Sequence, residues 1–363
     1  MLSSAIMHTR IAQVSIDNEA LRHNLSQVKA FAPDSKVIAV IKANAYGHGV
    51  HNAAAVLSGA DAFALATPNE AVLLRQSGVT KVLIVLQGFS SLDELKLLAS
   101  HNIQPVIHHP SQVDLLEQCA EVTLDVWLKV DTGMHRLGVP ADRVEACCQR
   151  LRACGSVANI RLMSHFANAD DPDHSLNQQQ LSVLNSIADQ TGIHDISMAN
   201  SAALIALPDS HKQWVRPGIM LYGSSPLNGK SAEELNLKSV MQFESRLIAV
   251  QNLKQGDAIG YGSLWQCPED MRVGVVAAGY ADGYPRHAKS GTPVWINGAL
   301  CPLVGRISMD SLCVDLRGVE ISVGERVVLW GRELSVDVVA KHADTISYEL
   351  LCHTGAGFVS STR

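Results

Sequence analysis

Short apolar runs alternate with longer amphipathic segments along the first two thirds of the chain. The runs are rich in β-branched residues, which is typical of buried strands, and they span residues 37–41, 62–66, 82–86, 104–108, 122–130, 160–164, 195–199 and 219–222. Apolar residues recur at helical spacing between them, at 69–76, 91–99, 112–119, 143–151 and 178–190. Strands separated by helices indicate parallel βαβ units, because a parallel neighbour requires a crossover.

Eight such strands are the number that closes a (β/α)8 TIM-like barrel. An open doubly wound sheet is the alternative, but no G-x-G-x-x-G follows the first strand, where a dinucleotide-binding fold needs it. From about residue 235 short β-rich runs recur between Gly, Pro and Asn, with one helical stretch at 336–341. We therefore predict an α/β protein with a barrel domain at residues 9–234 and a mainly-β domain at 235–363.

Composition narrows the class of protein. The chain is 47% hydrophobic and 18% charged, as ordinary folded proteins are. A net charge of -6 without a basic cluster argues against nucleic acid or a membrane surface as partner. No apolar stretch approaches bilayer length, and the first ten residues lack the apolar run of a signal peptide. The eight cysteines form no C-x-x-C pair, so we expect reduced thiols and a cytoplasmic location.

Polar residues stand next to the predicted barrel strands, where barrel enzymes carry their reactive groups. They are Lys42 after the first strand, Lys129 and Asp131 at the end of the fifth, His165 after the sixth, Asn200 and Ser201 after the seventh, and Arg216, Pro217 and Gly218 at the entrance to the eighth. Each alone has a structural explanation, as a solvated charge, a hydrogen-bonded histidine or a helix cap. Their occurrence on one rim indicates a functional site.

Lys42 follows the apolar run 37–41, so we expect its stem to be buried and its neutral amine to be favoured. A neutral amine attacks an aldehyde to form a Schiff base. A lysine that extends from the rim into solvent is the alternative.

The segment 41–49, Ile-Lys-Ala-Asn-Ala-Tyr-Gly-His-Gly, resembles the pyridoxal-phosphate attachment motif of alanine racemases. Further segments similar to that family follow in its order: 129–138, 164–167, 199–203, 216–219, 261–262, 279–283, 305–310 and 348–349. The resemblance implies an isomerase that interconverts L-alanine and D-alanine through a pyridoxal 5′-phosphate aldimine. Gly260 is a departure, since the family pattern predicts serine or a similar small residue there.

The resemblance implies two bases, which inversion of a stereocentre requires because a proton leaves one face and another arrives on the opposite face. Lys42 carries the cofactor and serves one face, and Tyr261 of the partner subunit in a homodimer serves the other. His165 hydrogen-bonds that tyrosine, and Arg216 polarises the histidine and faces the pyridine nitrogen. A guanidinium has no proton to give, so reprotonation at Cα is favoured over transamination. An exposed turn tyrosine and a surface arginine are the structural alternatives.

Further roles follow from the same resemblance. Arg136 contacts the cofactor's phenolic oxygen and the substrate carboxylate, and the amide of Met309 adds to carboxylate binding. Lys129 is carbamylated and holds Arg136 in place, with an unmodified lysine paired with Asp131 as the alternative. The residues implied to bind the phosphate end of the cofactor are Tyr46, Asn200, Ser201, Gly218, Ile219 and Tyr348. The residues implied to line the substrate entrance are Asp170, Tyr280, Arg286 and Arg306.

Three other functions compete with racemisation. An amino-acid decarboxylase of the same fold needs an acidic partner for the ring nitrogen, where this chain has Arg216. A metal hydrolase that uses a carbamylated lysine needs paired histidines on the first strand, and residues 37–41 hold none, so no metal is expected. A non-catalytic pyridoxal-phosphate carrier lacks the β domain. The sequence leaves open whether D-alanine is made for peptidoglycan or degraded.

Overall fold

The computed structural model describes residues 10–119, 121–357 and 361–362. The chain forms two compact units: one is Glu19–Lys238, and the other joins the N-terminal segment up to Asn18 to the chain from Ser239 onward. We call them the barrel unit and the β unit. The start predicted for the barrel domain, Thr9, lies outside the described residues.

The barrel unit is a closed ring of eight parallel strands, as predicted. Hydrogen bonding runs in the order β2-β3-β4-β5-β6-β8-β9-β10, and β10 returns to β2. Their bounds are β2 (Lys36–Val40), β3 (Ala62–Leu65), β4 (Val82–Val85), β5 (Ile103–Ile107), β6 (Leu124–Asp131), β8 (Val157–Met163), β9 (Ile196–Ser197) and β10 (Trp214–Val215). Every residue of β3 is buried, because barrel side chains fill the inside and helices cover the outside.

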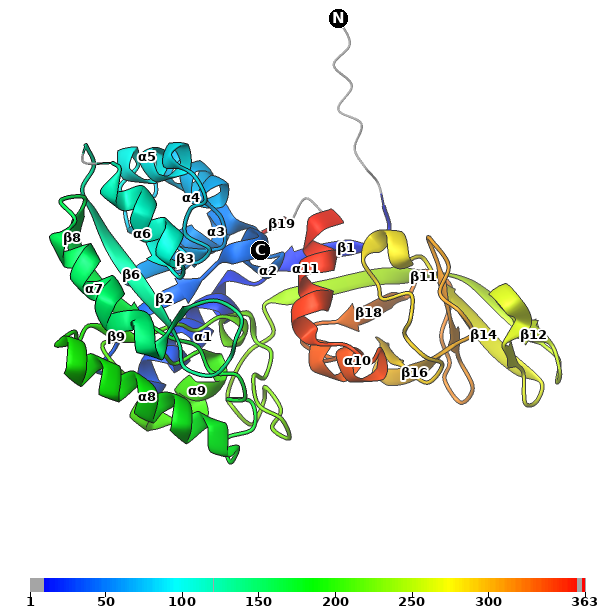
Figure 1. Cartoon of the computed structure of the whole chain (residues 1–363). Helices are drawn as coiled ribbons and strands as arrows, with labels where there is room; N and C mark the ends of the chain where they lie inside the picture. The colour runs from blue at the N-terminus through cyan, green and yellow to red at the C-terminus, as the bar shows by residue number, and fades with distance from the viewer. Residues whose placement is uncertain (1–9, 120, 358–360, 363) are drawn as a thin grey trace, which may run out of the picture. The chain divides into compact units, whose positions relative to one another are not determined.

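Helices surround the barrel strands (Figure 1). They are α1 (Asn18–Phe31), α2 (Lys42–Tyr46), α3 (Val50–Val56), α4 (Pro68–Gln76), α5 (Leu92–Ser100), α6 (Pro110–Glu117), α7 (Val144–Ala153), α8 (Ser175–Thr191) and α9 (Ser201–Ala206), with short elements β7 (Val139–Pro140), η1 (Ala141–Arg143), η2 (Pro208–Ser210) and η3 (Ile219–Tyr222). Capping side chains start several of them, as Ser91 does when it accepts a hydrogen bond from the Glu94 amide. None of the helices in the described part of the chain is long and apolar enough to span a bilayer.

The prediction of the eighth strand at 219–222 is wrong. That segment is the 3-10 helix η3, and the eighth strand is β10, which pairs with β9 and β2. The segment is apolar because η3 is buried, and Tyr222 donates a hydrogen bond to the Val40 oxygen at 2.9 Å. Arg216 therefore directly follows a strand, at the same edge of the barrel as Lys42.

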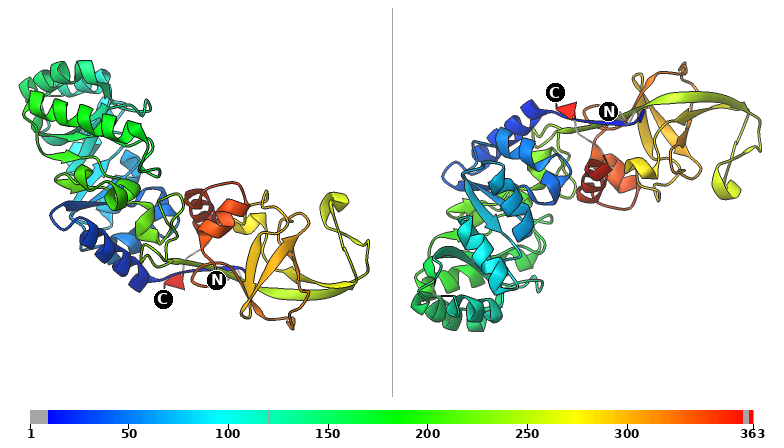
Figure 2. Two further views of the ribbon diagram at one scale, coloured as in Figure 1. Left: turned by 90° about the horizontal axis from the view of Figure 1, so that it is seen from below. Right: turned by 90° about the horizontal axis from the view of Figure 1, so that it is seen from above.

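The β unit contains a second closed ring, of antiparallel strands, in the order β11-β14-β17-β16-β15-β18 with β18 again on β11. The strands of the β unit from residue 239 onward include β11 (Met241–Leu253), β12 (Ala258–Ile259), β13 (Trp265–Gln266), β14 (Met271–Val276), β15 (Pro293–Ile296), β16 (Ala299–Val304), β17 (Leu312–Asp315) and β18 (Arg326–Trp330). Of these, β12 and β13 pair with each other outside the ring. The helices of this unit are η4 (Tyr261–Ser263), η5 (Tyr280–Asp282), α10 (Val336–His342) and α11 (Ser347–Gly357). Figure 2 shows β11 as a long strand running through this unit.

The N-terminal strand β1 (Gln13–Ile16) also belongs to the β unit. It pairs antiparallel with β11 and parallel with β19 (Ser361–Thr362). The apolar pattern did not predict β1, because four residues with alternating burial give too short a signal. By contrast, Asn297-Gly298 forms the tight turn between β15 and β16 with both φ values positive, as such pairs do in hairpins.

Trp330 lies at the centre of the β unit's core and is fully buried. Its ring centroid is 4.8 Å from that of Phe243, edge to face, and 5.9 Å from that of Tyr284, stacked. Phe243 and Trp330 are also opposite each other in the pairing of β11 with β18. Large aromatic side chains contribute much of the burial energy of a core, so this cluster holds the two strands together.

Replacing Trp330 by alanine should lower the free energy of unfolding of the β unit by about 3–5 kcal/mol, because a large buried side chain is replaced by a cavity. Hydrogen exchange at the slowest amides of β11 and β18 measures the loss. Trp295 on β15 is the matched control, since it is half-buried and lies beneath the Arg326 guanidinium. Trp295→Ala should cost markedly less, and equal losses would contradict this account of the core.

Candidate active site

Lys42 begins a short turn, α2, that has left-handed backbone angles. The four residues 43–46 have φ between 52° and 54°. A non-glycine residue in this conformation costs about 1–2 kcal/mol, and such residues normally occur singly. Gly47 continues the positive φ at 82°. Lys42 and Tyr46 are thus attached to a strained segment, and such strain persists only where the surroundings enforce it.

Arg216 follows β10 and is almost completely buried, with 5% of the residue exposed. Its Nη1 donates to Ser197 Oγ at 2.6 Å, and its Nη2 donates to the backbone oxygens of Ser164 and Met198. Nη2 also lies 3.4 Å from His165 Nδ1. Burial lowers the pKa of Arg216 to about 10, which still leaves the guanidinium charged at neutral pH. The guanidinium is therefore fixed next to the histidine.

Positive charge gathers around His165 and Lys129. Burial, followed by the charges of Arg216, Arg136 and Lys42, lowers the pKa of Lys129 to about 8. Burial and the charges of Arg216, Lys129, Arg136 and Lys42 hold the pKa of His165 well below 6.5, so its imidazole is neutral at pH 7. These five predicted residues come together at one rim, where their summed field favours an anionic ligand.

A group of hydroxyls and backbone amides lies at the same end of the barrel. Ser201 Oγ accepts from the amides of Gly218 at 2.8 Å and Met220 at 3.4 Å. A β-carbon placed on Gly218 would lie 2.6 Å from the Tyr46 hydroxyl, so glycine is needed for this close approach. Hydroxyls and clustered amides of this kind are the donors that proteins offer to phosphate.

Asn200 and Ile219 flank this donor group. Asn200 is the N-cap of α9, and its Oδ1 accepts from the Ala203 amide at 3.0 Å. Ile219 is buried at the start of η3. Asn200 therefore has a capping role, which fixes the position of Ser201 next to it.

Asp131 does not direct its carboxylate to Lys129 but to its own loop. Its Oδ1 accepts from the amides of Gly133 and His135 at 3.0 Å each, and its Oδ2 lies 3.0 Å from His135 Nδ1. Of the charges that act on the pKa of Lys129, Asp131 contributes least. The surroundings of Lys129 are therefore dominated by cations, among them Arg136 from the same loop.

Tyr261 lies in the β unit and is presented on a turn between two glycines. Gly260 and Gly262 have φ of 71° and 79°, and both lie against Arg306. Tyr261 is 69% exposed. The departure from the family pattern at Gly260 thus coincides with a left-handed position that suits glycine.

Tyr280 and Met309 lie on adjoining loops of the β unit. The Tyr280 amide donates to the Ser308 oxygen at 3.1 Å. A β-carbon on Gly279 would collide with the backbone oxygens of Ser308 and Met309. Met309 is 53% exposed and Tyr280 is 39% exposed. Arg306, three residues before Met309, therefore connects this loop to the turn that carries Tyr261.

The remaining predicted residues are Arg286 and Tyr348 in the β unit and Asp170 in the barrel unit. Arg286 is exposed on the loop after η5, and Tyr348 lies near the start of α11. In the barrel unit, the Asp170 carboxylate accepts from Asn228 Nδ2 at 2.9 Å. The predicted site residues therefore fall into one set on the barrel rim and another on the β unit.

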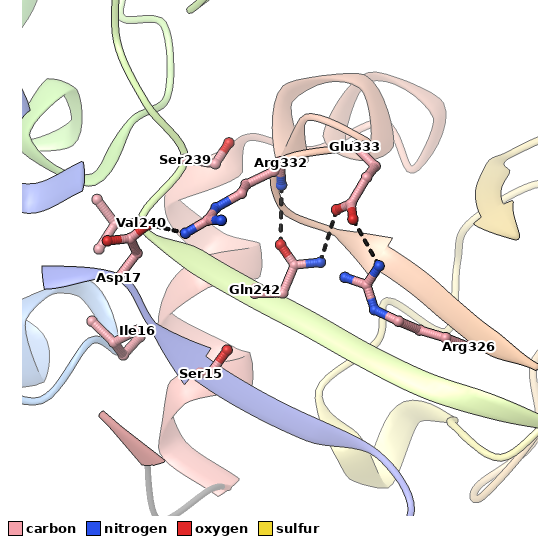
Figure 3. A pocket seen from close by; sticks show the side chains of 9 residues that line it. All are labelled: Ser15, Ile16, Asp17, Ser239, Val240, Gln242, Arg326, Arg332 and Glu333. Carbon is pink, nitrogen blue, oxygen red and sulfur yellow. Dashed lines mark hydrogen bonds and ion pairs between the residues drawn. The ribbon is translucent and has the colours of Figure 1, made fainter. Parts of the chain in front are cut away.

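Figure 3 shows a separate cavity of about 90 Å³ inside the β unit. A continuous chain of hydrogen bonds and ion pairs runs along it, from Arg326 through Glu333, Gln242 and Arg332 to Asp17. Ligand pockets commonly exceed about 300 Å³. Because these side chains neutralise one another, the cavity is a structural junction, and none of the predicted site residues lines it.

Sequence reasoning missed the residues that hold the site in place. Tyr222 stacks on Tyr46 with 4.8 Å between ring centroids and on His48 with 4.5 Å. Ser164 and Ser197 fix the Arg216 guanidinium. Both serines lie within predicted strands, but nothing in the sequence marks them as partners of Arg216, and Ser164 binds it through its backbone oxygen. Tyr222 was assigned to a strand that does not form.

A parallel barrel that gathers a lysine, a neutral histidine, further cations and phosphate-type donors on one rim defines a barrel enzyme for an anionic ligand. The family model described as "Alanine racemase, N-terminal domain" matches residues 16–226, and "Alanine racemase, C-terminal domain" matches residues 240–360. The chain belongs to the alanine racemase family and is an isomerase.

Similar proteins support this assignment over nearly the whole chain. An alanine racemase of Nitrosococcus oceani is 50% identical over 343 residues, which cover 94% of this chain and 96% of that protein. The crystal structure of a biosynthetic alanine racemase from Pseudomonas aeruginosa has a TM-score of 0.95 at 40% identity and covers 98% of this chain and 99% of that one. An alanine racemase structure from Acinetobacter baumannii has a TM-score of 0.93 at 38% identity, with 98% and 100% covered.

The lowered pKa of Lys129 predicts unusual reactivity for this amine. Acetylation at Lys129, followed by peptide mass spectrometry in CO2-free buffer, should reach half its maximal rate near pH 8, because only the neutral amine reacts. Arg216→Met should move this midpoint upward, since it removes the largest of the charges that lower the pKa. Lys254, whose pKa Asp270 raises, is an internal control in the same digest. Equal profiles for Lys129 and Lys254 would contradict the prediction.

Proposed function

We propose that the protein interconverts L-alanine and D-alanine with pyridoxal 5′-phosphate as cofactor. Membership of the alanine racemase family carries this proposal. The rim that joins Lys42 to a cluster of cations and phosphate-type donors supports it. When bound, pyridoxal phosphate supplies an aldehyde for the amino group of the substrate and a ring that withdraws electrons from its Cα.

The residues of the rim fit this cofactor. Lys42 offers the amine that joins the aldehyde, and Ser201, Tyr46 and the amides of Gly218 and Ile219 offer donors to the phosphate, with Tyr348 added from the β unit. The close approach of Gly218 to the Tyr46 hydroxyl supports this arrangement, because any larger residue would fill the space. Arg216 is assigned to the pyridine nitrogen.

Two bases perform the inversion. The Lys42 amine removes or returns the α-proton on one face of the substrate, and the Tyr261 hydroxyl acts on the opposite face. His165, neutral and next to Arg216, accepts a hydrogen bond from Tyr261 and so makes it a better base. Since Tyr261 lies on the β unit and is 69% exposed, we assign it to the site of a second copy in a head-to-tail homodimer.

Arg216 determines which reaction follows proton removal. Its contacts are a hydroxyl, backbone oxygens and His165, and it carries no proton that it could transfer to a ring nitrogen. With the cofactor bound, an unprotonated ring nitrogen would withdraw less charge from Cα and so favour return of a proton there. Decarboxylation on this fold requires an acid at this position, so the arginine favours racemisation.

The remaining residues bind and select the substrate. Arg136 holds the substrate carboxylate and the phenolic oxygen of the cofactor, and the Met309 amide of the partner copy adds a second donor. The substrate entrance is formed by Asp170, Tyr280, Arg286 and Arg306. A narrow entrance of this kind favours alanine over longer amino acids.

Lys129 is proposed to exist as a carbamate. Its neutral amine adds to carbon dioxide and releases a proton, and the lowered pKa near 8 makes that amine available at neutral pH. The product is an anion among Arg216, Arg136 and Lys42, which relieves their repulsion and orients Arg136. The eight free cysteines support a reducing, cytoplasmic location.

The test is formation of D-alanine from L-alanine by the purified protein with added pyridoxal phosphate. Tyr261→Phe keeps the ring and removes the hydroxyl, so turnover should fall by about 100-fold or more, the contribution typical of a general base. The loss in kcat/KM should be equal in the two directions, because the enantiomers have equal free energies and Tyr261 takes the proton in one direction and returns it in the other. Tyr284→Phe, a buried change in the same unit, is the control and should keep its activity. A wild-type protein that binds the cofactor and forms no D-alanine would overturn the function.

A shared site predicts complementation between two inactive variants. Lys42→Ala and Tyr261→Ala should each be inactive, whereas coexpression should restore about a quarter of wild-type activity, because half of the dimers are mixed and each has one intact site. Separately purified proteins that are assayed without subunit exchange are the control. If both bases come from one copy, no mixed dimer contains an intact site and activity stays absent.

A further inference from the structure

The strained turn α2 receives a contact from a different helix. Glu70 stands in the first turn of α4, and its Oε1 accepts a hydrogen bond from the Ala43 amide at 2.9 Å. Ala43 directly follows Lys42 and is the first left-handed residue of the turn. The Glu70 carboxylate thus acts on the peptide bond that joins Lys42 to the strained segment.

The other oxygen of Glu70 is also engaged with the backbone. Its Oε2 accepts from the amides of Ala66 at 2.8 Å and Thr67 at 3.1 Å, while Thr67 Oγ1 caps the Glu70 amide in return. This capping box starts α4 directly after β3. One carboxylate therefore ties the loop after β3 to the loop after β2, two neighbouring strands of the barrel.

The turn has further attachments within its own loop. His48 is completely buried, and its Nδ1 lies 3.0 Å from the Ala45 oxygen and 2.9 Å from the Tyr46 oxygen. Asn44 Oδ1 accepts from the Val50 amide at 2.9 Å. These contacts hold the end of the turn that carries Tyr46, whereas Glu70 holds the end that carries Lys42.

We propose that Glu70 is a positioning residue for Lys42: its carboxylate holds the left-handed turn in place so that the lysine is presented to the cofactor. The inference rests on the proposed function and extends it to a residue that touches neither substrate nor cofactor. This support is needed because residues 43–46 include no glycine, so each of them adopts positive φ at a cost in conformational free energy. Without the carboxylate, the turn relaxes and the lysine amine moves.

Glu94 provides a closely matched control. It occupies the same position in the next helix, α5, where its amide donates to Ser91 Oγ at 3.2 Å and its Oε2 accepts from the Ser90 amide at 2.7 Å. This contact caps a helix and involves no left-handed turn. Glu94→Gln therefore replaces one acceptor oxygen of a capping carboxylate by an amide NH2, as Glu70→Gln does, and leaves Lys42 unaffected.

The experiment measures binding of pyridoxal phosphate to the full-length apo protein, by absorbance and by borohydride reduction with location of the adduct in peptides. Glu70→Gln should weaken the affinity and slow adduct formation at Lys42 by on the order of tenfold, because a small displacement of a reacting group has effects of this size. Glu94→Gln should bind as the wild type does. Adding Ala43→Gly to Glu70→Gln should restore binding, since glycine adopts this φ without strain and the Ala43 side chain is exposed.

The outcomes separate the two proposals. If the wild type forms no adduct at Lys42, the proposed function fails. If the wild type does form it and Glu70→Gln matches Glu94→Gln, the positioning role is wrong. It is equally wrong if Glu70→Gln is impaired and Ala43→Gly restores nothing, because Glu70 would then act by a route other than the turn. Should Glu70→Gln fail to fold, Glu70→Asp, which shortens the reach by one methylene, takes its place in the same comparison.

Discussion

Repulsion between like charges is the constraint on which the barrel rim depends. The charges of Lys42, Arg136 and Arg216 lower the pKa of Lys129. Together with Lys129 they also lower the pKa of His165, which remains neutral among them. Such an arrangement raises the free energy of the unliganded protein, and hydrogen bonds to neutral groups hold it together. An anionic ligand removes that cost when it binds, so the rim combines affinity for anions with an amine, that of Lys129, whose pKa is lowered to about 8.

The parts of the fold that the sequence predicts are those with a strong local pattern. Strands β2 to β5 have both faces buried, so they stand out as apolar runs between amphipathic helices. Strand β10 has two residues and gives no such signal, while the apolar residues of η3 imitate a strand because they are buried. Strand β1 forms because it pairs with β11, which is more than 200 residues away in the sequence. Tertiary pairing determines these elements, and local sequence does not.

The candidate site divides in a similar way. Lys42 and His165 could be predicted because chemistry in a barrel collects where strands end, whereas Arg216, expected at the entrance to a strand, was assigned from the family resemblance. Their supports could not, since nothing near Arg216 in sequence indicates that Ser197 binds it, and a capping glutamate such as Glu70 resembles any other until the turn that it contacts is known. Residues that react have types characteristic of their chemistry, whereas residues that position them are recognised only from geometry.

The pairing of β1 with β11 also has a consequence for how the chain is made. A ribosome releases residues 13–16 first, yet their partners at 241–244 emerge only after the whole barrel unit has been synthesised. The barrel strands pair mostly with the next strand along the chain, and β10 closes the ring on β2 before β11 has been synthesised. The nascent N-terminus must therefore stay unpaired through most of translation, and the β unit is completed last. Slow or interrupted synthesis would yield a barrel lacking the surface that carries Tyr261.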